Sequence, residues 1–266
     1  MKQLSARDSA FLAEMGIGPL WRLRQQPVAA SEEDGTAPAP GDAELALGRA
    51  RDGTPDGVMN TPAEPDVSQM DWPALRAAIA GCARCGACRP GAKPVYGAGA
   101  ESAVWLVAAG ATSVADEQEG VPVAGEAGKL LDNMLAAAGH ARATDVFVTN
   151  LVKCRPASAN GGDRAPTADE VDACRPFLER ELALSGAGVL VTLGQVAANA
   201  MLGKPVHESL AGARGQVHAV GGAAMVATLH PAELLRRGTD KALAWADLCR
   251  AMAVEPGAGA ADDAAF

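Results

Sequence analysis

The chain has 266 residues, of which 48% are hydrophobic and 3% aromatic, and its formal net charge is −9. This length and apolar content suffice for a sizeable core, built mainly from Ala, Val and Leu. No apolar run is long enough to span a membrane and no signal-peptide pattern opens the chain, so we expect a cytoplasmic protein with no membrane contact. In that compartment, six cysteines indicate metal ligation or catalysis rather than disulfide bonds.

The negative charge is concentrated outside the expected folded core. Residues 27–71 carry ten acidic and two basic side chains, and residues 254–266 carry three acidic side chains and no basic one. Residues 72–253 carry seventeen of each. A neutral core is compatible with a DNA-binding face, so the net charge does not exclude a nucleic-acid partner.

The N-terminal part divides into two segments. Residues 1–26 contain an amphipathic stretch, 5–24, that we expect to form a short helix ending near Gly16. It can dock on a protein partner or pack on the domain, and the sequence leaves both readings open. Residues 27–70 are rich in Ala, Pro, Gly and acidic residues, too poor in large apolar groups to offset the entropy of ordering, so we predict a disordered linker. We predict the same for the tail, 255–266.

Residues 71–254 form the predicted domain, in which helices alternate with strands. In chain order we expect a helix over 71–81, a cysteine-bearing loop over 82–99, a strand over 103–108, a polar Gly-rich loop over 109–125, a helix over 126–138, a strand over 145–149, a helix over 167–185, a strand over 189–193, a helix over 195–202, a hairpin-like segment over 214–229 and a last helix over 241–254. Thr167 and Glu170 are spaced as a capping box. The alternation predicts a three-layer α/β/α sandwich with a central, mostly parallel, four-stranded sheet.

Four cysteines suggest a metal site. Cys82 and Cys85 form a C-x-x-C pair, and Cys154 and Cys174 follow far downstream. Cys88 makes a second C-x-x-C with Cys85, so the pairing is ambiguous. Four thiolates suit either a tetrahedral zinc ion or a [4Fe–4S] cluster, and unrelated, unligated thiols are the plainer alternative.

Two polar residues follow predicted strands directly. In open α/β sheets, ligands bind at the carboxyl ends of the strands. Asn150 offers an amide that can read the edge of a planar heterocycle. His230, followed by Pro231, can place an imidazole over a pocket and donate a hydrogen bond to a developing anion, although a lone histidine is more often structural. Cys249 on the last helix is most simply a buried core thiol.

These residues together resemble a known family. The blocks 82–85, 95–99, 120–131, 148–156, 191–194 and 230–236 occur in the order seen in type-4 uracil-DNA glycosylases, the iron–sulfur members of the uracil-DNA glycosylase superfamily. The resemblance covers about residues 80–252. It implies a DNA-repair hydrolase that breaks the N-glycosidic bond of uracil, or of another deaminated base, after flipping the base out of DNA. We expect a monomer.

The resemblance also assigns roles to individual residues. Asn150 matches the asparagine that reads uracil, and His230 the histidine that stabilises negative charge on uracil O2. The implied ligands of a [4Fe–4S] cluster are Cys82, Cys85, Cys154 and Cys174, which leaves Cys88 and Cys249 off the family's ligand positions. The remaining implied residues are Gly110, Ala111 and Val123 in the substrate pocket and Pro231, Leu234, Leu235 and Arg236 in the segment that inserts at the DNA minor groove.

Two positions depart from the family. Gly110 stands where the family has a catalytic acid, whose loss typically costs about 10²–10⁴-fold in rate. Val123 replaces the aromatic side chain that stacks on uracil, worth roughly 1–3 kcal/mol per base. Asp116 and Glu117 match an acidic pair that often follows the first motif. The alternatives are therefore a non-catalytic iron–sulfur DNA-binding paralogue and, more remotely, a zinc-stabilised module that acts through protein contacts of its N-terminal segment.

Overall fold

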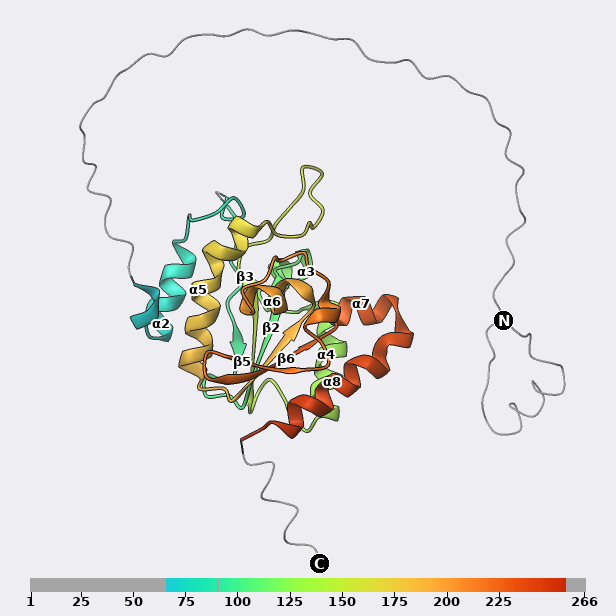
Figure 1. Cartoon of the computed structure of the whole chain (residues 1–266). Coiled ribbons are helices and arrows are strands. Elements are labelled where there is room, and N and C mark those ends of the chain that lie inside the picture. Colours follow the sequence, from blue (N-terminus) through green and yellow to red (C-terminus); the bar gives the residue numbers. More distant parts are fainter. Residues whose placement is uncertain (1–65, 90, 257–266) are drawn as a thin grey trace, which may run out of the picture. The chain divides into compact units, whose positions relative to one another are not determined.

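The computed structural model describes residues 66–89 and 91–256, drawn in colour in Figure 1. The helix expected within 5–24 and nearly all of the predicted linker and tail lie outside these residues. The described part begins before the domain boundary expected at residue 71. A short 3₁₀ helix, η1 (Val67–Gln69), precedes the first α-helix, and Val67 is buried in the core.

A mixed sheet of six strands forms the centre of the domain, in the order β1-β3-β2-β4-β6-β5. The strands are β1 (Ala98–Gly99), β2 (Trp105–Ala111), β3 (Val146–Val152), β4 (Val189–Leu193), β5 (Val217–Val220) and β6 (Ala223–Thr228). Neighbours among β3, β2, β4 and β6 pair in parallel. The two edge strands, β1 and β5, pair antiparallel with β3 and β6. The prediction of four strands was therefore wrong in number: it identified the parallel centre, placed β5 only within a hairpin-like segment, and missed β1.

The helices follow the predicted order with two additions. They are α2 (Trp72–Ala80), α3 (Val114–Glu119), α4 (Gly125–Ala137), α5 (Ala168–Ser185), α6 (Gln195–Met201), α7 (Pro231–Arg236) and α8 (Lys241–Ala253), with the 3₁₀ helices η2 (Leu210–Gly212) and η3 (Gly238–Asp240). The capping box of Thr167 and Glu170 at the start of α5 is confirmed. The loop predicted over 109–125 was wrong in part, because α3 lies within it. That six-residue helix is too short for a periodic signal and is fixed by a capping box of Ser113 and Asp116.

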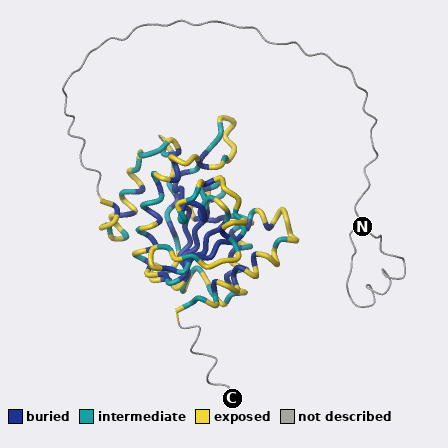
Figure 2. Tube along the Cα trace, in the orientation of Figure 1, coloured by how far each residue is buried: buried dark blue, intermediate teal, exposed yellow. Residues whose placement is uncertain are grey.

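The central strands are buried (Figure 2). Their side chains alternate, so the sheet has a separate apolar cluster on each face. Leu106, Phe147 and Leu190 pack with residues of α2 and α5 on one face. On the other face, residues of β2, β3, β4 and β6 pack with α4 and α8. This arrangement is the predicted three-layer sandwich. None of the helices in the described ranges is long and apolar enough to cross a membrane.

One core prediction was wrong. Cys249 on α8 is exposed, whereas α8 buries Ala244, Asp247, Leu248 and Ala251. Those four residues recur at helical spacing, so the face that Cys249 occupies turns to solvent. Leu248 is buried, but its neighbour Cys249 is not, so the adjacent leucine was a poor guide to the burial of Cys249.

Candidate active site

Asn150 lies near the carboxyl end of β3 and is fully buried. Its side-chain nitrogen, Nδ2, donates to Asp116 Oδ2 at 2.9 Å and to Thr112 Oγ1 at 3.2 Å. Because a carboxylate only accepts hydrogen bonds, the amide nitrogen must be the atom that faces Asp116. The amide oxygen, Oδ1, is buried without a hydrogen-bond partner in the described structure. A buried acceptor left unpaired is costly, and here it is free to receive a donor from a ligand.

Asp116, on α3, is the residue around which this site is organised. The carboxylate is buried and accepts hydrogen bonds from three partners: Ser113 N at 3.1 Å, Ala124 N at 2.8 Å and Asn150 Nδ2 at 2.9 Å. Asp116 thus lies next to Asn150, and its carboxylate orients the groups that donate to it. Glu117, its neighbour in the acidic pair, is turned to Arg155, with Oε2 2.9 Å from Arg155 Nε.

His230 follows β6 and serves as the N-cap of α7. Its Nδ1 accepts a hydrogen bond from Ala232 N at 3.1 Å. Burial lowers the pKa of His230 to about 4, against the opposing effect of the Asp116 charge and with the help of Arg236. At neutral pH the ring is therefore uncharged, and because Nδ1 accepts, the ring proton is on Nε2. The Asp116 charge acts to raise the pKa of His230, and the same carboxylate accepts a hydrogen bond from Asn150 Nδ2.

The residues that depart from the family pattern are also close-packed. A Cβ added at Gly110 would lie 3.0 Å from Val196 Cβ on α6, so the backbone position is crowded by that helix. Ala111 is partly exposed at the end of β2. Val123 is buried and has a φ of 50°, a conformation that β-branched residues rarely adopt.

The four residues expected to meet DNA divide into two pairs. All belong to the short helix α7. Pro231 and Leu234 are buried, and Leu234 lines an apolar groove with residues of α4 and α8. Leu235 is 50% exposed, and Arg236 is exposed as well. Leu235 and Arg236 are therefore the two of these four side chains that are exposed to solvent.

Cys82 and Cys85, in the loop after α2, come close to Cys154, which follows β3, and Cys88 joins them. The Sγ of Cys88 lies 3.5 Å from Cys85 Sγ, 3.8 Å from Cys82 Sγ and 3.4 Å from Cys154 Sγ. Cys174 on α5 is buried in the apolar cluster against which these cysteines pack. Sequence reasoning had set Cys88 aside, and the second C-x-x-C spacing was the signal that could have kept it.

The chemistry of this donor set fits a thiolate-bound cluster. All five sulfurs lie in or against the apolar cluster between the sheet, α2 and α5. Burial raises the pKa of Cys174 to about 12, so the free thiol is neutral and a bound metal would have to displace its proton. Within the described residues, no group of three or more His, Cys, Asp or Glu side chains has the arrangement of ligands around a single metal ion. Soft sulfur donors of this kind are those that iron–sulfur clusters use.

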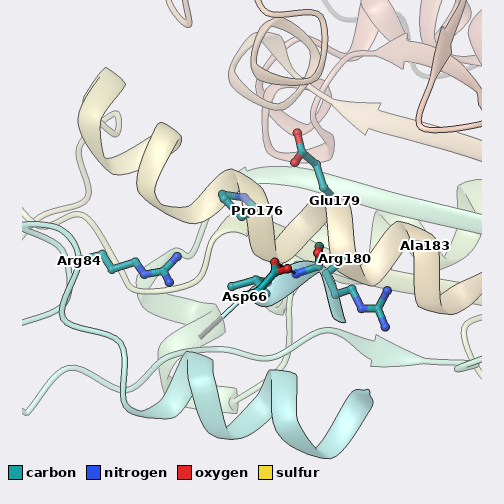
Figure 3. A pocket seen from close by; sticks show the side chains of 8 residues that line it. Asp66, Arg84, Pro176, Glu179, Arg180 and Ala183 are labelled. Atoms are coloured by element: carbon teal, nitrogen blue, oxygen red, sulfur yellow. Dashed lines mark hydrogen bonds between the residues drawn. The ribbon is translucent and has the colours of Figure 1, made fainter. Parts of the chain in front are cut away.

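A separate surface cavity of about 400 Å³ lies between η1, the cysteine-bearing loop and α5 (Figure 3). Asp66, Arg84, Glu179 and Arg180 line it with charges of both signs. Arg180 Nε donates to Met70 O, and the Arg84 guanidinium lies over the Phe177 ring, 5.4 Å from its centroid. None of the lining residues is a predicted site residue, so the cavity is no part of the candidate active site.

Comparison with known proteins agrees with this geometry. Residues 96–249, more than half of the chain, match the family described as "Uracil DNA glycosylase superfamily". The chain belongs to the uracil-DNA glycosylase superfamily. The matched region contains Asn150, Asp116 and His230, and begins after the C-x-x-C pair.

Several relatives carry the name "Type-4 uracil-DNA glycosylase". The chain is similar to the one from Pyrobaculum aerophilum, with 30% identity over 175 residues, or 63% of this chain and 86% of the relative. It is similar to the one from Archaeoglobus fulgidus, with 38% identity over 120 residues, or 45% of this chain and 58% of the relative. For the Thermotoga maritima protein the values are 35% over 128 residues, 47% and 63%. The chain thus spans somewhat more than half of two of these superfamily members and most of the third.

Proposed function

We propose that this chain is a uracil-DNA glycosylase that hydrolyses the N-glycosidic bond of uracil, or of another deaminated base, flipped out of DNA. The observation that carries the proposal is the buried, unpaired Oδ1 of Asn150, whose Nδ2 is held by Asp116. His230, with a pKa lowered by burial, leaves the same edge of the sheet at the carboxyl end of β6. Family membership supports the reaction class. The non-catalytic alternative is not favoured, because the relatives bear an enzyme's name.

Base selection follows from the orientation of the Asn150 amide. Uracil carries a hydrogen on N3, whereas cytosine has a bare acceptor there. The free Oδ1 of Asn150 can accept from the uracil N3–H, and it would face the cytosine N3 with two acceptors and no proton. Because Asp116 occupies Nδ2, the amide cannot turn over to suit cytosine without losing that hydrogen bond.

Bond cleavage leaves negative charge on the departing base, and His230 is suited to meet it. The neutral ring holds its proton on Nε2, so it can donate a hydrogen bond from that nitrogen to the anion. A donor of this type is worth about 10²–10³-fold in rate. Since Gly110 supplies no acid and the Asp116 oxygens are taken by N–H groups, stabilisation of the anion carries a larger part of the catalysis.

The partner is DNA, which we propose meets α7 through Leu235 and Arg236. Leu235 is the exposed apolar side chain that can fill the space left in the base stack, and Arg236 can pair with a phosphate. The described domain holds the whole site, so we propose that it acts as a monomer. We propose a cytoplasmic location, supported by six cysteines that are all free of disulfide bonds.

Cys82, Cys85, Cys154 and Cys174 would hold a [4Fe–4S] cluster, as the resemblance implies. When bound, the cluster would cross-link the loop after α2, the segment after β3 and α5, and so contribute folding energy. The position of Cys88 makes this assignment testable. Cys174→Ser should lose most of the iron and sulfide and the broad visible absorption, whereas Cys88→Ser should keep them, with the exposed Cys249→Ser as a matched control. Iron loss in Cys88→Ser, with iron retained in Cys174→Ser, would mean that Cys88 and not Cys174 is the fourth ligand.

The glycosylase itself is tested with anaerobically purified protein and an oligonucleotide that contains one uracil. Abasic sites are revealed by alkaline cleavage. Wild type should cut and His230→Ala should lose about 10²–10³-fold in kcat, while His207→Ala, a change at an exposed histidine outside the site, should leave the rate unchanged. A folded, DNA-binding wild-type protein that leaves uracil intact would support the non-catalytic alternative.

A further inference from the structure

The turn that forms one wall of the proposed base pocket is held in an unfavourable conformation. Val123 lies at its tip, buried and with a φ of 50°. A β-branched residue in this region is strained and persists only where surrounding contacts fix it. The contacts that fix Val123 therefore also fix the wall of the pocket.

Arg142, in the segment between α4 and β3, supplies these contacts from outside the pocket. Its Nη1 donates to Pro122 O at 2.8 Å and its Nη2 to Val123 O at 3.1 Å. The third nitrogen, Nε, pairs with the exposed Asp132, whose Oδ1 lies 2.6 Å away. Two nitrogens on successive carbonyl groups make use of the rigid fork of arginine, a geometry that a lysine ammonium cannot reproduce.

The same turn is held on its inner side by the site itself. Ala124 N donates to Asp116 Oδ1 at 2.8 Å, and Asp116 in turn holds Asn150. Gly128 on α4 leaves room for the turn, since a Cβ there would lie 2.3 Å from Val123 O. A continuous set of hydrogen bonds thus runs from Arg142 through the turn and Asp116 to the amide that reads the base.

We propose that Arg142 is a positioning residue for the base pocket: it holds the turn at Pro122 and Val123, and through Ala124 and Asp116 it sets the placement of Asn150. The inference rests on the proposed glycosylase function. Positioning of the turn by Arg142 matters more here than it would if an aromatic side chain lined the pocket. Val123 cannot stack on the base, so its backbone must be held in place. Arg142 touches neither base nor sugar and acts through the turn alone.

The test compares Arg142→Lys with Asp132→Asn in steady-state assays on uracil-containing DNA, with inhibition by free uracil as a second readout. Arg142→Lys keeps the charge and loses the fork, so KM and the inhibition constant of uracil should each rise about tenfold while kcat changes less than about threefold. Asp132→Asn keeps both contacts to the turn, so both constants should stay within about twofold of wild type. Thermal denaturation of the three proteins reports on folding separately.

Two results would overturn this inference. Equal effects of Arg142→Lys and Asp132→Asn would mean that Arg142 serves general stability, and wild-type constants in Arg142→Lys would mean that the turn needs no clamp. Both require an active wild-type enzyme. A wild type without glycosylase activity would instead remove the proposed function, and this inference with it.

Discussion

Two histidines at opposite ends of the sheet have opposite electrostatic surroundings. His230, at the carboxyl end of β6, has its pKa lowered to about 4 by burial. His140 precedes β3, at the amino end of the sheet, and stacks on Trp105 with 4.3 Å between the ring centroids. Burial would lower the pKa of His140 too, but hydrogen bonds to Asp145 at 2.7 Å and Glu255 at 2.9 Å outweigh it and raise the pKa.

The two ends therefore differ in role: the carboxyl end holds the candidate site, and the His140 cluster at the amino end (His140, Asp145, Glu255 and Trp105) links parts of the fold. At the amino end both ring nitrogens of His140 have partners, and Glu255 also accepts from Trp105 Nε1 at 2.8 Å, which ties the segment after α8 to the start of β2. At the carboxyl end Asn150 Oδ1 has none. Fully paired groups stabilise the fold, whereas an oriented group with one open position has a place for a ligand.

The largest effect that would test this comparison is expected from Asp116→Asn. The new amide can donate to Asn150, which would then turn its own nitrogen toward the base and lose its match to the uracil N3–H. Loss of a charge-assisted hydrogen bond of this type costs about 1.5–3 kcal/mol, so kcat/KM for uracil should fall about 10–100-fold. Measurement on paired uracil and cytosine substrates should show less discrimination between them. Unchanged kinetics in a folded variant would remove Asp116 from the site.

The His140 cluster is tested with His140→Gln, which should lower stability and leave kcat/KM within about twofold of wild type. Because the pKa of His140 is raised on folding, its contribution is fully present below the unfolded value of 6.5 and is lost as pH rises through the folded value. Urea denaturation should therefore show a deficit of about 2 kcal/mol in the free energy of unfolding at mildly acid pH. The deficit should shrink on the alkaline side; a constant deficit at every pH would argue for packing on Trp105 alone.

The smallest effect is expected in the acid limb of the activity profile. With its pKa lowered to about 4, His230 stays neutral over the whole mildly acid range, so kcat/KM should show no fall near 6.5 from this residue. The same depression means that its contribution to stability is present above 6.5 and is lost as pH falls towards 4. A fall in kcat/KM centred near 6.5, absent in His230→Gln, would contradict a neutral ring.

The parallel centre of the sheet, the longer helices and the positions of Asn150 and His230 at strand ends could all be predicted from the sequence. These features depend on local propensity, such as the apolar strand 189–193 and the capping box of Thr167 and Glu170, and each is written within one stretch of chain. The cysteine ligands were likewise predicted from short sequence blocks that resemble the family, each within one stretch of chain.

The contacts between residues far apart in the sequence became known only from the tertiary structure. The role of Asp116 depends on Asn150, 34 positions away, and that of Arg142 on a turn 19 and 20 positions before it. The strand β1 has two residues and no periodicity of its own, so β3 alone defines it. The inclusion of Cys88 and the exposure of Cys249 likewise follow from how elements pack. Such pairings are set by strand register and helix orientation, which no local pattern of residues encodes.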